Sequence, residues 1–233
     1  MNTAITLAID ASTYVGTVAV WRGETRVAEG EALMRGVEEE RLMPAVVATL
    51  AKGGAALRDV TRVVCGGGPG SFTSLRIAAA IGKGIVTGAA GRANLHAVPS
   101  LALIVGANAD RLEPGRYLVL LDAMRDERYA QLVRLSEDRR VIAEADVTRL
   151  PVGEVASACE RYGAQAIGPA EMLEGTPHAR GALAVAGAWS SLPAISLNDW
   201  EPTYGRLAEA QVKWETAHGR SLPPSTRLPG AES

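Results

Sequence analysis

The most informative stretch of this chain is Cys65-Gly66-Gly67-Gly68-Pro69-Gly70-Ser71-Phe72-Thr73-Ser74-Leu75-Arg76-Ile77. It follows a short β-branched run, Val60 to Val64, and precedes a helix-like stretch from Ser74 to Ala90. A strand, a glycine turn and a helix N-terminus form a corner whose free backbone N–H groups can face an anion. The spacing matches neither the G-x-G-x-x-G of a dinucleotide site nor the Gly-Lys-Ser/Thr of a P-loop. The corner is therefore either a structural strand–helix turn or a site for a phosphate or a partner.

The residues before this corner predict three strands and a helix. The first strand, residues 3–10, alternates and ends in the carboxylate of Asp10. Two strands at 14–21 and 25–33 flank a hairpin turn at Arg22-Gly23-Glu24. From 39 to 51 the apolar residues follow a helical period, after an acidic start at Glu38-Glu39-Glu40 that suits the helix dipole.

The residues after the corner predict a second, β-rich unit. Pro114-Gly115 breaks the pattern, and we expect a lobe boundary there. We expect an N-terminal lobe at 1–112 that contains the glycine loop 66–72, a C-terminal lobe at 113–220, and a disordered tail at 221–233. The expected elements are strands at 93–98, 116–122, 128–136, 140–146 and 165–168, helices at 100–109, 152–162, 182–192 and 207–217, and an extended stretch at 193–197.

The helix after the corner is small or apolar on most of its circumference. Its residues include Gly84 and Gly88, and small side chains let another helix approach closely at a cost in helix propensity. One face packs on its own sheet, and a second neighbour from the preceding helix or from another chain would explain the other. The predicted partner interface, which pattern alone leaves open between core and interface, consists of Leu42, Met43, Val46, Val47, Leu75, Ala79 and Gly82.

The net charge, the cysteines and the apolar runs of the sequence exclude several classes of function. A protein that binds nucleic acid by itself usually carries a basic surface, so the formal net charge of −2 argues against such binding by this chain alone. Arg125, Arg128 and Arg134 form either a nucleic-acid-facing patch or, as we favour, a solvated strand face. The two cysteines, Cys65 and Cys159, are too far apart for a zinc knuckle and indicate a reducing compartment. We see no secretion signal and no apolar run near the roughly 20 residues that span a bilayer, so we expect a cytoplasmic protein with no membrane partner.

Four motifs resemble those of the bacterial TsaB (YeaZ) family. They are Ile9-Asp10-Ala11-Ser12-Thr13, the run Gly68 to Ile77 (similar to GPGSFTGLRIG), Asp122 to Tyr129 (similar to DARxxEVY) and Trp200 to Arg206 (similar to EPxYxR). They cover most of the chain in the right order. The resemblance implies an α/β protein of the actin-like ATPase and sugar-kinase (ribonuclease H-like) superfold, with two lobes that each hold a mixed β-sheet and flanking helices.

The resemblance also implies a function and partners. The family serves the synthesis of N6-threonylcarbamoyladenosine at position 37 of tRNAs that read ANN codons. Its members are non-catalytic paralogues of TsaD, pair with TsaD through two N-lobe helices, work with the ATPase TsaE, reach tRNA through the complex, and also form homodimers. No cofactor is required. Asp10, Gly68, Gly70 and Ser71 are the candidate nucleotide contacts: in a degenerate paralogue they are either vestigial or serve a nucleotide (ATP or ADP) at a partner interface.

The chain departs from the family pattern at four positions. Ser74 and Ala78 stand where the family has glycine, Glu38 where it has histidine, and Met124 where it has arginine. TsaD holds a metal through paired histidines on the helix that corresponds to Ser100-Leu101-Ala102-Leu103, where this chain has none. Its three histidines, His96, His178 and His218, show no i,i+4 spacing, and HExxH is absent, so we expect no metal and no catalysis by this chain.

The alternative is a stand-alone ATP-dependent small-molecule kinase or ATPase of the same superfold. Asp10 would then bind magnesium and nucleotide; the competing interpretation is that it hydrogen-bonds Ser12 or Thr13 at the strand end. Asp122 ends a strand in a suitable place for a catalytic acid, but no Asp-Gly-Gly/Thr phosphate loop follows it. The sequence therefore favours the non-catalytic subunit.

Overall fold

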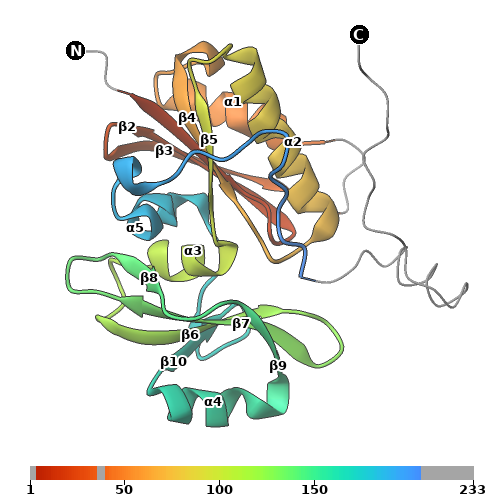
Figure 1. Ribbon diagram of the computed structural model, residues 1–233, viewed down its shortest axis with the longest axis vertical. Coiled ribbons are helices and arrows are strands. Elements are labelled where there is room, and N and C mark those ends of the chain that lie inside the picture. The colour runs from red at the N-terminus through yellow and green to blue at the C-terminus, as the bar shows by residue number, and fades with distance from the viewer. Residues whose placement is uncertain (1–3, 36–39, 206–233) are drawn as a thin grey trace, which may run out of the picture.

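The computed structural model describes residues 4–35 and 40–205 as two mixed β-sheets, stacked with helices between and outside them. Figure 1 shows α1 and α2 on the outer face of the first sheet and α4 on the outer face of the second. The shorter helices α3 and α5 lie between the two sheets. This arrangement confirms the predicted architecture of two lobes.

The first sheet has five strands in the order β3-β2-β1-β4-β5. The strands β1, β2 and β3 form an antiparallel meander, and β4 and β5 run parallel to β1. All six residues of the central β1 are buried, because helices cover both faces of the sheet. The elements of this part are β1 (Ile5–Asp10), β2 (Val15–Arg22), β3 (Thr25–Leu33), α1 (Leu42–Lys52), η1 (Leu57–Asp59), β4 (Val60–Gly66), α2 (Phe72–Gly88) and β5 (Asn94–Val98).

The second sheet has six strands. Five follow the order β11-β10-β6-β7-β8, and β9 pairs with β7. The long β6–β7 hairpin is its centre, and α3 covers its inner face. The elements are α3 (Ser100–Gly106), β6 (Gly115–Asp122), β7 (Glu127–Leu135), β8 (Val141–Ala143), β9 (Thr148–Pro151), η2 (Val152–Glu154), α4 (Val155–Tyr162), β10 (Gln165–Gly168), β11 (Leu173–Glu174), η3 (Ala179–Gly181), α5 (Ala182–Ala186) and η4 (Trp189–Ser191).

Several predicted boundaries of local structure were wrong, among them the helix expected at 100–109, which ends at Gly106. The helix expected from residue 39 begins at Leu42. The Glu40 carboxylate accepts hydrogen bonds from the N–H groups of Leu42 and Met43, the first two residues of the helix, and so caps its N-terminus. The helix expected at 182–192 is interrupted at Gly187, whose φ is +70°. The strand expected at 140–146 ends at Ala143, and the short strands β9 and β11 were not predicted. The predicted helix 207–217 and tail 221–233 lie outside the described residues.

The chain returns from the second sheet to the first before it ends. Ala179, Ala182 and Trp189 pack against Trp21 on the face of the first sheet opposite α1 and α2. The Trp189 ring meets the Trp21 ring edge-on at 5.2 Å between centroids. Part of the segment predicted to belong to the C-terminal lobe (113–220) therefore packs on the first sheet. The division of the chain into two lobes at residues 112 and 113 stays a prediction. None of the helices in the described part of the chain has the length and apolar content to cross a bilayer.

Candidate functional site

The glycine corner joins β4 to α2, and its backbone N–H groups are largely used within the chain. Gly67 N–H donates to the Val98 carbonyl at 2.8 Å, and Ser71 N–H donates to the Ser12 carbonyl at 2.7 Å. Gly68, whose φ is +84°, donates its N–H to Ser100 Oγ at 2.9 Å. Ser74, which replaces a family glycine, is buried and hydrogen-bonds through its hydroxyl to Ser71 Oγ at 3.0 Å. The corner is thus held by three neighbouring segments.

Asp10 lies at the end of β1, directly beneath this corner. Its carboxylate is fully buried and accepts the N–H and the hydroxyl of Ser12 at 3.1 and 2.7 Å, and the hydroxyl of Ser100 at 2.6 Å. Burial raises the pKa of the Asp10 carboxyl, and the hydrogen bonds from Ser100 and Ser12 oppose that rise. Thr13, the other hydrogen-bonding candidate, donates to Val15 instead. A nucleotide or magnesium contact of Asp10 stays a prediction.

Residues 201–205, which we call the closing segment, cover the corner from outside. Thr203 N–H donates to the Gly67 carbonyl at 2.8 Å, and an added Cβ on Gly68 would lie 2.1 Å from the Thr203 carbonyl oxygen. The Tyr204 ring packs against Phe72 at 4.5 Å between centroids. An added Cβ on Gly205 would lie 2.5 Å from the Tyr129 ring of β7. The closing segment therefore ties the corner of the first sheet to the second sheet.

These contacts limit how Gly68, Gly70 and Ser71 could bind the phosphates of a nucleotide. Gly68 and Ser71 already donate their N–H groups within the chain, and Gly70 packs so closely on Ser12 that an added Cβ would lie 2.1 Å from its carbonyl oxygen. The space outside Gly68 holds Thr203. A nucleotide contact of Gly68, Gly70 and Ser71 therefore stays a prediction, and it would require the closing segment to move.

The predicted partner interface divides into core and surface residues. Leu42, Val46 and Leu75 have no exposed surface, and Ala79 and Gly82 are also buried. A residue that is buried within one chain adds no area to an interface. Of the seven predicted interface residues, only the half-buried Met43 and Val47, which is 47% exposed, are accessible to a partner.

A groove of ≈ 420 Å³ lies beside Met43, between α1, η1 and α2. An added Cβ on Gly84 or Gly88 would have nothing within 4 Å, so both glycines open onto this surface. Sequence reasoning had marked α2 as rich in small residues but had not separated this open stripe from the buried one. The groove is lined by Met43, Leu57, Arg58, Ile81, Gly84, Ile85, Gly88, Ala89 and Arg92.

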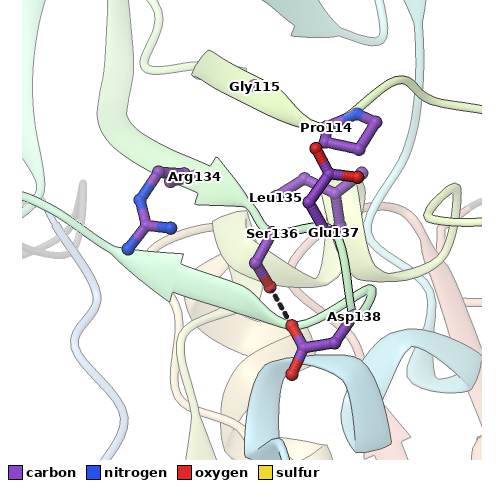
Figure 2. Close-up of a pocket in the computed structure, with 7 residues that line it drawn as sticks. All are labelled: Pro114, Gly115, Arg134, Leu135, Ser136, Glu137 and Asp138. Atoms are coloured by element: carbon purple, nitrogen blue, oxygen red, sulfur yellow. Dashed lines mark hydrogen bonds between the residues drawn. The ribbon is translucent and has the colours of Figure 1, made fainter.

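A second hollow of ≈ 480 Å³ lies at the opposite end of β7, where the β7–β8 turn meets the start of β6. Figure 2 shows the Ser136 hydroxyl hydrogen-bonded to the Asp138 carboxylate within the β7–β8 turn, and this bond lowers the pKa of the Asp138 carboxyl. Arg134 at its edge pairs with Glu144, Nε to Oε1, at 2.8 Å. Because Ser136 pairs with Asp138 and Arg134 pairs with Glu144, these side chains give no indication of a catalytic or ligand-binding role for the hollow.

The remaining reactive side chains are also tied within the chain. Burial raises the pKa of the Cys65 thiol to about 12, so this cysteine is a core residue and no nucleophile. His96 Nδ1 donates to the Pro193 carbonyl at 2.9 Å. In the described part of the chain, no group of three or more His, Cys, Asp or Glu side chains is placed to hold a metal ion.

The order of the first sheet, with an acid at the end of β1 and a glycine corner before α2, defines a two-lobed protein of the actin-like ATPase and sugar-kinase superfold. A solved structure from Pseudomonas aeruginosa, described as an uncharacterized protein with similarity to peptidase YeaZ, superposes with a TM-score of 0.72. It is 26% identical, over 87% of this chain and 100% of that one. The family model for TsaD, tRNA N6-adenosine threonylcarbamoyltransferase, matches residues 38–156.

Two curated relatives carry the same name. The tRNA threonylcarbamoyladenosine biosynthesis protein TsaB of Bacillus subtilis (strain 168) is 27% identical over 89% of this chain and 96% of its own length. The TsaB of Escherichia coli (strain K12) is 39% identical over 36% of either chain. The chain belongs to the TsaB (YeaZ) family.

Proposed function

We propose that this protein is a non-catalytic subunit of the machinery that makes threonylcarbamoyladenosine in tRNA, and that it acts by pairing with a TsaD-like subunit through the α1–α2 groove. The observation that carries the proposal is the open stripe of Gly84 and Gly88 between the apolar side chains of Ile81 and Ile85. Small residues on a helix surface let a second helix approach closely, and apolar surface of this kind marks interaction sites.

The two ends of helices α1 and α2 carry different charges. Glu40 precedes α1, while Lys52, Arg58 and Arg92 lie at or beyond the carboxyl ends of α1 and α2, where Arg58 and Arg92 also line the groove. A second copy that packs antiparallel across a two-fold axis would place opposite charges together. The same face therefore suits self-pairing in the absence of a TsaD-like subunit, and the two partners would compete for it.

Several features support a role without catalysis. The groups that would perform chemistry near the corner, Asp10 and Cys65, are buried, and Asp10 is hydrogen-bonded to the protein's own serines. Asp122, the candidate acid of the kinase alternative, accepts from Met124 N–H at 3.0 Å and pairs with Arg128. The chain also lacks the HExxH sequence of a zinc peptidase. Any ATP or ADP at the partner interface would need residues from the partner, and a TsaE-like ATPase would join the assembled pair.

The pairing test uses matched glycine substitutions. Gly84→Arg places a long cationic side chain in the groove, whereas Gly153→Arg adds the same side chain at an equally open position in η2 of the second sheet's lobe. We expect Gly84→Arg to abolish co-elution with the TsaD-like subunit of the same source, and Gly153→Arg to leave it unchanged. Co-elution of both variants with the partner would refute the groove as the interface.

A further inference from the structure

Two stacked pairs of arginine and aromatic side chains lie at the corner end of the first sheet. The Arg35 guanidinium lies 4.7 Å from the centroid of the Tyr14 ring. The Arg76 guanidinium lies 5.4 Å from the centroid of the Phe72 ring, and Phe72 is the only phenylalanine of the chain. Phe72 also contacts Tyr204 of the closing segment. Tyr14 is 53% exposed and Phe72 is half-buried, so most of the aromatic surface that faces solvent belongs to Tyr14.

The two pairs come from neighbouring loops. Ser12, two residues before Tyr14, accepts the N–H of Ser71, the residue before Phe72. Tyr14 in turn accepts the N–H of Met34, the residue before Arg35. The loops after β1, after β3 and before α2 therefore meet at one edge of the sheet. We call Tyr14, Arg35, Phe72 and Arg76 the Arg–aromatic surface.

Several other arginines in the described residues form ion pairs instead. Arg116 and Arg134 both pair with Glu144, and Arg128 pairs with Asp122 and lies 3.8 Å from Glu171. These pairings agree with the interpretation of Arg128 and Arg134 as a solvated strand face. Within residues 4–35 and 40–205, Arg35 and Arg76 contact rings and make no ion pair that would neutralise their charge.

We propose that the Arg–aromatic surface contacts unpaired bases of the RNA substrate. This inference rests on the proposed function, because the RNA would reach the surface through the assembled complex. Proteins recognise unpaired RNA by stacking its bases on aromatic rings and on guanidinium planes, and both are offered here side by side. The cation–π contacts also hold the two arginines close to the rings, so that the surface is ordered before RNA arrives.

The local charge predicts how this contact behaves. Glu38 to Glu40 and Glu201 lie close in sequence to Arg35 and Tyr204, and the whole chain carries a net charge of −2. The attraction for RNA phosphates is therefore weak, and stacking supplies the contact. Because phosphate neutralisation governs the dependence on salt, the contribution of this surface should change little with ionic strength.

The experiment measures binding of unmodified ANN-reading tRNA to the complex of this chain with its TsaD-like subunit. Tyr14→Ala and Arg76→Ala are expected to weaken binding about tenfold each, the usual order for loss of one base stack, with an unchanged slope against salt. The matched control is Tyr162→Ala, which removes an exposed tyrosine with Arg161 at 6.0 Å on the distant α4 and should have no effect. A photoreactive phenylalanine analogue at position 14 should crosslink to a single-stranded loop of the tRNA and ignore duplex RNA.

Each outcome decides the inference. Unchanged tRNA affinity in both variants, with pairing to the TsaD-like subunit intact, would overturn it. Loss of pairing with the TsaD-like subunit in both variants would also overturn it, since the surface would then be a protein contact. Failure of the proposed function is visible separately, as full tRNA modification in the absence of the wild-type chain.

Discussion

Ser100 links Asp10 to the glycine corner through one hydroxyl group. Its Oγ donates to Asp10 Oδ2 at 2.6 Å and accepts from Gly68 N–H at 2.9 Å. All three groups are buried, so the Gly68 N–H and Asp10 Oδ2 both rely on the Ser100 hydroxyl as a hydrogen-bond partner away from water.

Replacing Ser100 should therefore cost more than one ordinary hydrogen bond. Ser100→Ala leaves the Gly68 N–H and one carboxylate oxygen of Asp10 without this partner, and we expect a loss of about 2–4 kcal/mol in unfolding free energy. Chemical denaturation of the wild type and the variant measures the loss. Ser191→Ala in η4, where no such chain of hydrogen bonds passes through the hydroxyl, serves as the control and should change stability by less than about 0.5 kcal/mol. Equal stability of the wild type and Ser100→Ala would contradict the linkage.

Two glycines of α2, two residues apart, should respond oppositely to alanine. An added Cβ at Gly82 would lie 2.6 Å from Cys65 Sγ, whereas at Gly84 it would meet nothing within 4 Å. Gly82→Ala is expected to destabilise the protein by about 1–3 kcal/mol through overpacking, and Gly84→Ala to stabilise it by up to about 1 kcal/mol through helix propensity. Thermal unfolding of both variants is the measurement, and a destabilised Gly84→Ala would show that the open stripe is misplaced. For the same reason, Gly82→Arg is unsuited to a test of pairing.

The stability of the protein should fall in mild acid, in part because of His178. His178 Nδ1 accepts from Arg180 N–H at 3.0 Å, so protonation of this nitrogen would break the bond. Burial and the charge of Arg180 lower the pKa of the imidazole, although Glu29 and Glu31 oppose this. Since the folded pKa lies below the unfolded value of about 6.5, the stabilisation is present above pH 6.5 and is lost as the pH falls.

The replacement His178→Asn tests this assignment. Asparagine offers a side-chain oxygen to the same backbone N–H and does not titrate. The midpoint of thermal unfolding should therefore depend less steeply on pH between about 6.5 and 5 than in the wild type. Some slope should remain, because the pKa of His96 is also lowered by burial. Identical pH profiles would rule out His178 as a contributor.

The closing segment depends on Gly205. Its φ of +72° favours glycine, and an added Cβ would meet the Tyr129 ring at 2.5 Å. Gly205→Ala should release the segment at a cost of about 1–3 kcal/mol and expose Phe72. Proteolysis after Tyr204 or an increase in amide exchange of Thr203, whose N–H donates to the Gly67 carbonyl, would report the release. Unaltered protection of the Thr203 amide would mean that Gly205 does not hold the segment on the corner.

The elements with a clear period could be predicted from the sequence, and the choice of helix face could not. The strands β1, β3 and β10 and the start of α3 follow directly from alternation and from Pro99. On α2, however, small and apolar residues occupy most of the circumference, so no pattern distinguishes the buried Ala79 and Gly82 from the open Gly84 and Gly88. Contacts with Cys65 and Val63 of β4 and Leu95 of β5 decide which stripe of α2 faces the sheet.

The site depends still more on contacts between distant residues. The pairing of Asp10 with Ser12 is local and was among the predicted alternatives. The contacts of Asp10 with Ser100, and of Gly67 with Thr203, join residues about 90 and 136 positions apart. No local pattern in a single sequence reports such pairs. The closing segment was recognised as a motif, but its place over the glycine corner became visible only in the folded protein.

We propose that this chain activates a tRNA-modifying partner and performs no chemistry itself. The most direct measurement is formation of threonylcarbamoyladenosine in unmodified tRNA by the TsaD-like and TsaE-like subunits of the same source, supplied with threonylcarbamoyl-AMP. The assay is run without this chain, with it, and with its Gly84→Arg variant. We predict product only with the wild-type chain, none with Gly84→Arg, and none from the chain alone. Full product formation without the chain would contradict the claim.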